Sequence, residues 1–189
     1  MISGGTVTVT AKDDAINAAS HITITGGTIY ACATNNDGID ANGNCYIKGG
    51  VIFAIGTRQP EVAIDANTEK NFNLYVSGGT LIAIGGLERG SSLTQTCYQA
   101  SSWSANKWYA LTVGSETIAF KTPSSGGSGL VVSGASQPTL KQGVTVSDGT
   151  AVFGGLGYVN ATVTGGSSVT LSTYNNNNGG GGGGGPWGW

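Results

Sequence analysis

The acidic residues of this chain are concentrated in a few similar segments. Six of the ten lie between positions 13 and 65, in DDAINA (13–18), NDGIDA (36–41) and EVAIDA (61–66). Alignment of these segments on their isoleucines gives three columns, which are Asn17, Asp40 and Asp65; Asp13, Asn36 and Glu61; and Asp14, Asp37 and Val62. Calcium takes carboxylate and amide oxygens as ligands. The acids of these columns, with Asn17 as a neutral oxygen donor, are therefore candidate metal ligands.

Two interpretations of these columns remain open. If the segments stack as neighbouring strands, Asp40 and Asp65 lie about 4.8 Å apart, and their like charges destabilise the pair. A calcium ion, with ligand distances of about 2.3–2.6 Å, could bridge carboxylates on adjacent strands. In the other interpretation, the Asp and Asn side chains cap strand-end amides and stay hydrated. The EF-hand pattern is absent, so the expectation of an ion depends on stacking geometry.

A repeat places these segments on strands. Gly-Gly pairs begin at Gly4, Gly26, Gly49 and Gly78, at intervals of 22, 23 and 29 residues. Each pair opens a β-type segment (GGTVTVTA, GGTIYACA, GGVIFAIG, GGTLIAIG), and a further short strand follows the acidic segment (HITIT, CYIK, NLYVS). Three strands per 22–23 residues, joined by Gly, Asn and Asp turns, predict one coil of a parallel β-helix. A hairpin sandwich is the competing interpretation.

The regular pattern ends near residue 86. We expect one all-β solenoid domain over residues 1–174, with regular coils in 1–86 and less regular coils or an antiparallel C-terminal cap in 87–174. An Asn/Gly-rich tail ending in PWGW follows at 175–189. Three aromatic residues, Trp103, Trp108 and Tyr109, lie close together in the sequence. They could stack on sugar rings, because aromatic faces offer area at little entropic cost, or they could pack the end of the solenoid.

Composition excludes several classes of protein. Glycine accounts for 34 of 189 residues and charged residues for 10%, which fits an all-β chain with many turns better than a helical bundle. The net charge of −2 argues against a nucleic-acid partner. We expect no membrane span, because no run of about 18 apolar residues occurs. The start lacks signal-peptide features, so the protein is either cytoplasmic or a mature or truncated piece, and the β pattern that begins within three residues favours truncation. Cys32, Cys45 and Cys97 suit buried small hydrophobes, although a Cys32–Cys45 bridge is conceivable.

The chain resembles a known family in three places. These are the GG-T-[IV]-x-[IV] strands, the segment DGIDANG (37–43), and VVSGASQPTLKQGVTVSDGTAVFGG (131–155). They are similar to the carbohydrate-binding domain family of right-handed β-helix proteins, which are secreted or surface proteins of clostridia and Bacteroidetes and resemble polysaccharide lyases. The resemblance implies a right-handed solenoid, an extracellular or cell-surface location, and binding of cellulose-like or pectin-like plant cell-wall polysaccharide. It also implies calcium, held by Asp14, Asp37, Asp40 and Asp65, with Asp13 and Glu61 second.

We therefore expect a non-catalytic, calcium-binding carbohydrate-binding module. One alternative is a self-assembling or adhesive surface solenoid, which would associate through its ends or its C-terminal tail. Another is a calcium-dependent polysaccharide lyase, which would need an Arg or Lys base beside the calcium. Only Lys12, Lys48 and Arg58 lie near the acidic strands, and none recurs in a column. No catalytic residue is therefore assigned.

Overall fold

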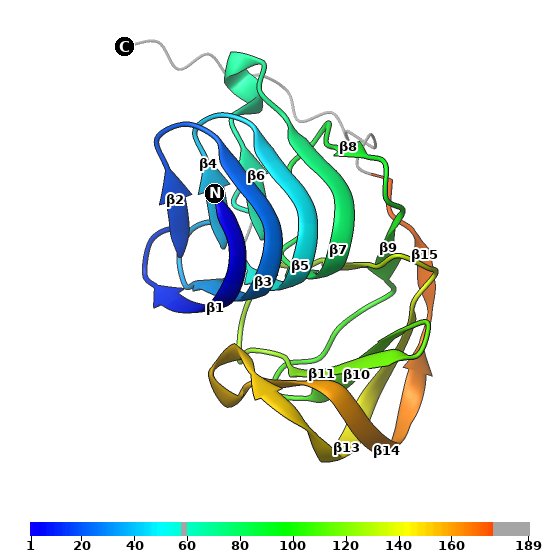
Figure 1. Cartoon of the computed structure of the whole chain (residues 1–189). Helices are drawn as coiled ribbons and strands as arrows, with labels where there is room; N and C mark the ends of the chain where they lie inside the picture. Colours follow the sequence, from blue (N-terminus) through cyan, green and yellow to red (C-terminus); the bar gives the residue numbers. More distant parts are fainter. Residues whose placement is uncertain (58–59, 176–189) are drawn as a thin grey trace.

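The protein is all-β, as predicted. The computed structural model describes residues 1–57 and 60–175, so Arg58 and the tail from residue 176 lie outside the described residues. Two parallel ladders form the N-terminal half (Figure 1). The long strands are β1 (Ile2–Ala11), β3 (Ile22–Ala33), β5 (Cys45–Ile55) and β7 (Leu74–Ile84), and the short strands are β2 (Ile16–Ala18), β4 (Ile39–Ala41) and β6 (Ile64–Ala66).

The parallel ladders stack equivalent residues of successive repeats. We call one long strand with the short strand that follows it a coil. Ile16, Ile39 and Ile64 are register partners on the short strands, and Ile29, Ile52 and Leu81 are register partners on the long ones. Inward aliphatic side chains thus lie on one another between the two sheets, and from the second coil onward they are fully buried. The structure therefore confirms that the four Gly-Gly segments occupy equivalent places in successive coils.

Beyond the third complete coil the sheets are mixed rather than wholly parallel. β8 (Ser92–Leu93) still pairs with β7 in parallel, but β12 (Leu130–Ser133) pairs with β7 in the antiparallel sense. The antiparallel strands β9 (Cys97–Ala100) and β15 (Leu171–Thr173) then extend the sheet. A parallel solenoid running to residue 174 is therefore not what the chain forms, and an antiparallel C-terminal part, which was also predicted, is present.

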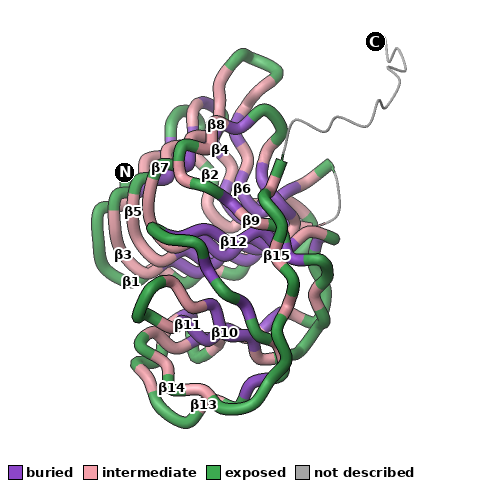
Figure 2. Tube along the Cα trace, turned by 90° about the vertical axis from the view of Figure 1, so that its right-hand side faces the viewer, coloured by how far each residue is buried: buried purple, intermediate pink, exposed green. Residues whose placement is uncertain are grey.

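Four more strands close into an antiparallel barrel beneath the parallel ladders (Figure 1). They are β10 (Trp108–Val113), β11 (Glu116–Lys121), β13 (Thr139–Val152) and β14 (Gly157–Val169), and the short 3-10 helices are η1 (Thr68–Lys70) and η2 (Phe153–Gly155). Phe53 of β5 packs edge-on against Phe120 and Phe153, with ring centroids 5.3 and 5.6 Å apart. A second core thus lies between the flank of the long strands and the barrel. Figure 2 shows buried segments in both the parallel ladders and the barrel.

The Gly-Gly pairs form the bends of the long strands. The second glycine of each pair has positive φ, for example +92° at Gly50 and +86° at Gly79, a conformation that glycine adopts without steric cost. The first glycine lies directly against the preceding coil, since a Cβ on Gly49 would be 2.4 Å from the carbonyl oxygen of Thr25. Both glycines are therefore required wherever another coil lies beneath.

The three cysteines form no disulfide bond. Cys32, Cys45 and Cys97 are free and buried, so they pack as small apolar side chains and the conceivable Cys32–Cys45 bridge is not formed. In the described part of the chain, no helix is long and apolar enough to cross a membrane.

A pair of alanine substitutions tests the stacking. Gly49→Ala should lower the free energy of unfolding by about 2 kcal/mol or more, because the new methyl group overlaps a backbone carbonyl that cannot move freely. Gly4→Ala is the matched control, since Gly4 holds the same place in the first coil and its Cβ meets nothing within 4 Å. Thermal unfolding followed by circular dichroism compares the two, and equal losses of stability would contradict the stacking.

Candidate metal centre

The acidic column lies on the outer face of the short strands. In β4 and β6 the sequence Ile-Asp-Ala places Ile39, Ala41, Ile64 and Ala66 in the core, all at most 1% exposed. The alternation of strand side chains directs the middle residue to the other face. Asn17, Asp40 and Asp65 are register partners there, as predicted.

Three carboxylates converge at this column. Asp37, Asp40 and Asp65 each offer an oxygen, and these oxygens lie within 4.8 Å of one another. Asp37 is buried, with 7% of its surface exposed, whereas Asp40 and Asp65 are half-buried. Ligands on opposite sides of a calcium ion are about 5 Å apart. The group therefore has the dimensions of a site for one cation held by oxygen.

The aspartates of the column Asp14, Asp37 and Val62 cap backbone amides. Asp14 Oδ1 accepts a hydrogen bond from the Asp37 amide at 3.2 Å, and Asp37 Oδ1 accepts one from the Val62 amide at 2.5 Å. Each aspartate thus satisfies an N–H of the next coil. The capping interpretation therefore applies to Asp14 and to one oxygen of Asp37, and the proposed ion would share Asp37 with this role.

The remaining predicted ligands are not part of the three-carboxylate group. Asn17 donates its side-chain N–H groups to Asp14 Oδ2 at 3.0 Å and to Asp40 Oδ2. In this conformation its nitrogen, and not its oxygen, faces the carboxylates, so it is not placed as a metal ligand. Asp13 is exposed and accepts a hydrogen bond from Asn36 at 2.7 Å. Glu61 is half-buried and contributes negative charge near Asp37.

The burial of these acids disfavours their charged forms. Desolvation raises the pKa of Asp37 to about 7, with smaller contributions from the charges of Glu61, Asp14 and Asp40, while the Val62 amide opposes the shift. Burial likewise raises the pKa of Asp40 and of Asp65, and Glu88 adds to the shift at Asp65. Neutralisation of the cluster, by protons or by a cation, would therefore stabilise it.

Sequence reasoning missed one member of the column. Leu87 forms a parallel bridge with Ile64, and the Glu88 amide donates to the Ile64 carbonyl at 3.0 Å, so Glu88 follows Asp65 on the same face. Glu88 also accepts a hydrogen bond from the Thr68 hydroxyl at 2.8 Å. The signal was available, because Leu87 follows Ile64 by 23 residues, the interval that separates Ile16 from Ile39.

The three predicted sugar-stacking residues do not form one platform. Tyr109 is 0% exposed and its hydroxyl donates to Gln142 at 3.0 Å, so the prediction that its ring stacks on sugars is wrong. The side chain belongs to the second core, which β10 and β11 form against the long strands. Trp103 donates to the Gly127 carbonyl at 3.0 Å, and Trp108 packs against Tyr158 with ring centroids 5.7 Å apart. Both are half-buried, on different partners.

The raised pKa of Asp37 predicts a pH dependence. Between about pH 4, near the carboxyl pKa of an unfolded chain, and pH 7, the folded protein binds more protons than the unfolded one. With calcium removed by EDTA, stability should therefore fall as pH rises through this window, by at most about 1.4 kcal/mol per pH unit for this group.

Asp37→Asn should reduce this slope, because the amide oxygen can still accept from Val62 but does not titrate. Asp148→Asn, at an exposed carboxyl on β13, is the control. Denaturant unfolding at several pH values measures the slope, and an unchanged slope in Asp37→Asn would rule out Asp37 as its source.

No family model matches the chain, and no curated protein or solved structure matches it.

Proposed function

We propose that this chain is a non-catalytic, calcium-binding carbohydrate-binding module that acts outside the cell on a plant cell-wall-type polysaccharide. In this proposal the parallel coils are a short right-handed β-helix. The observation that carries it is the convergence of Asp37, Asp40 and Asp65, whose oxygens lie within 4.8 Å of one another on two neighbouring coils.

The donor set favours calcium over other metals. All three groups are carboxylates, and hard cations with flexible coordination prefer oxygen ligands at this spacing. Zinc sites usually include His or Cys, and neither residue type belongs to this group. An ion here would link β4 to β6 and offset the repulsion between Asp40 and Asp65. It would therefore strengthen the stack of coils rather than perform chemistry.

The outer surface supports the carbohydrate part of the proposal. Charged residues make up 10% of the chain, and outward positions of the first two long strands carry threonines such as Thr8, Thr10 and Thr25, all exposed. Hydroxyl groups can both donate and accept hydrogen bonds, which suits the hydroxyls of an extended sugar chain. Rigid parallel strands hold these groups at a regular spacing.

Self-association is a second candidate function, favoured by the first coil. Among the described strands, β1 and β2 each form one edge of their sheet. Their inward side chains Val7, Val9 and Ile16 are only half-buried, whereas the equivalent Ile29, Ala31 and Ile39 are 0% exposed. Unpaired edge strands with apolar side chains can pair with another chain.

The calcium prediction is tested by thermal unfolding. At a free calcium concentration one hundred times the dissociation constant, binding should stabilise the wild type by about 2.7 kcal/mol, or about 5–10 °C for a chain of this size. The double variant Asp40→Asn and Asp65→Asn should lose this gain, and Asp148→Asn should keep it.

If the wild type has the same melting temperature in EDTA and in calcium, the acidic column only caps backbone amides. The carbohydrate part has its own assay, since the calcium-loaded chain should be retarded in native gels that contain soluble plant polysaccharide. Release of unsaturated product from polygalacturonate, followed by absorbance, would contradict the non-catalytic assignment.

Sedimentation velocity tests self-association. If the first coil mediates it, the wild type should form dimers as concentration rises, and Val9→Lys should shift the population to monomers by at least about tenfold in dissociation constant. Thr164→Lys, at an exposed position on β14, should leave the dimer unchanged. A monomer at every concentration would exclude this function.

A further inference from the structure

An aromatic pair lies on the outward face of the long strands, away from the acidic column. Tyr46 of β5 and Tyr75 of β7 are register partners. Their rings are stacked, with centroids 4.9 Å apart and an interplanar angle of 11°. Both side chains are half-buried, so part of each ring faces solvent. The next residues in the column, Thr23 on β3 and Ser92 on β8, are small and carry hydroxyl groups.

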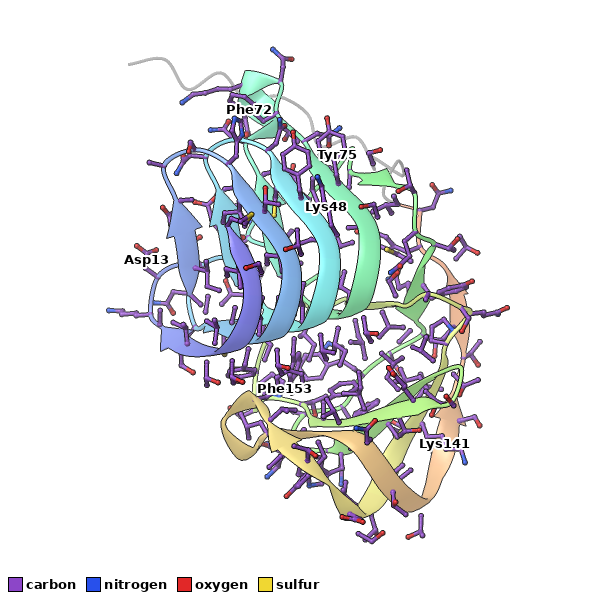
Figure 3. All side chains as sticks on the ribbon, in the orientation of Figure 1. Asp13, Lys48, Phe72, Tyr75, Lys141 and Phe153 are labelled. Atoms are coloured by element: carbon purple, nitrogen blue, oxygen red, sulfur yellow. The ribbon has the colours of Figure 1, made fainter. Side chains whose placement is uncertain are left out.

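Polar groups orient this pair. Asn44 donates its amide N–H to the Tyr46 hydroxyl at 2.9 Å, and Asn44 Oδ1 in turn accepts from the Asn73 amide at 2.8 Å. The exposed Lys48 places its ammonium 5.2 Å from the centroid of the Tyr46 ring. Figure 3 shows Lys48 and Tyr75 on the same face of the β5–β7 ladder, with Phe72 at the turn above them. The two stacked tyrosines thus form an ordered aromatic surface with the ammonium group of Lys48 beside it.

A polar pocket continues this face along β7. Two residues after Tyr75, the exposed Ser77 lines a pocket of about 500 Å³ together with Thr94, Gln95, Thr96, Tyr98 and Gln137. None of its lining residues is charged. Gln95 is held in place, since its side-chain amide donates to the Gly79 carbonyl and to the Ser133 hydroxyl, both at 2.8 Å. The pocket therefore offers hydroxyl and amide groups next to a further tyrosine.

We propose that this surface, from the Tyr46–Tyr75 pair to the pocket at Ser77 and Tyr98, binds a polysaccharide that contains uronic acid residues. This inference rests on the carbohydrate-binding function proposed above and names both the face and the charge of the ligand. The C–H face of a sugar ring packs on an aromatic ring, and its hydroxyls bond to side-chain amides and hydroxyls. Lys48 lies where it can pair with a carboxylate of the sugar.

The chemistry of the face disfavours other ligands. A nucleic acid requires a field of several basic residues, and the chain has a net charge of −2. An apolar helix or a lipid requires a contiguous apolar surface, whereas this pocket is lined mainly by Ser, Thr and Gln. A sugar polymer with occasional carboxylates fits both the aromatic pair and the single ammonium group beside it.

The test uses the calcium-loaded chain in native affinity gels that contain polygalacturonate or, separately, neutral hydroxyethyl cellulose. The wild type should be retarded more strongly by polygalacturonate. The double variant Tyr46→Leu and Tyr75→Leu keeps bulky side chains in the column and should bind about tenfold more weakly. Lys48→Met should weaken binding several-fold and reduce its dependence on salt. Tyr158→Leu, which removes a partly exposed ring of the Trp108–Tyr158 pair on the barrel, is the matched control and should bind as the wild type does.

Circular dichroism melts of each variant separate loss of binding from loss of fold, and Lys48→Met, at an exposed side chain, keeps the test valid if the double variant is unstable. If the wild type binds, and the tyrosine double variant and Lys48→Met both bind as strongly as the wild type, this surface is not the site, although the proposed function stands. Stronger retention by the neutral polymer would overturn the assignment to uronic acids. If the wild type binds neither polymer, the proposed function and this inference fail together.

Discussion

The in-register hydrogen bonding of parallel strands is the constraint on which the other features of this protein depend. It holds neighbouring strands about 4.8 Å apart and places each residue directly over its equivalent in the next coil. Where a column repeats one chemical type, the consequence depends on that type. Ile47 over Ile24 fills the core, Gly50 over Gly27 allows the bend, and Tyr75 over Tyr46 stacks two rings.

For acids the same constraint is unfavourable. Asp40 and Asp65 cannot separate without breaking the ladder that holds Ile39 against Ile64. Burial raises the pKa of both carboxyls, the charge of Asp14 adds to the shift at Asp40, and Glu88 adds to the shift at Asp65. The free energy of the stack therefore depends on what neutralises these acids. Asp14 and Asp37 gain part of the compensation from backbone amides of the next coil. A bound cation would supply the rest at neutral pH, which links the stability of the coils to their ligand.

The barrel determines which aromatic residues remain available. Tyr30, Phe53 and Ile82 face outward from the long strands, yet the barrel covers them and they are at most 5% exposed. Tyr46 and Tyr75 lie on the same strands before the Gly-Gly bends, on a face that the barrel leaves open. The bend therefore divides each long strand into a segment packed on the barrel and a segment with surface for a ligand.

The sequence by itself determined the all-β class, the repeat, and the columns of equivalent residues, because strand periodicity and paired glycines are local signals that survive without tertiary context. It placed Asp40 beside Asp65 correctly, and it contained the interval that leads to Glu88. Only the tertiary structure decided that antiparallel strands, rather than less regular coils, dominate after β7, and that Tyr109 is buried between the long strands and the barrel. Those outcomes depend on pairing between segments far apart in the chain, such as β7 with β12, and alternation alone does not distinguish a parallel partner from an antiparallel one. The same long-range pairing buried Tyr109, whereas the stacking of Tyr46 on Tyr75 follows from the repeat itself, because CYIK and NLYVS hold equivalent places in successive coils.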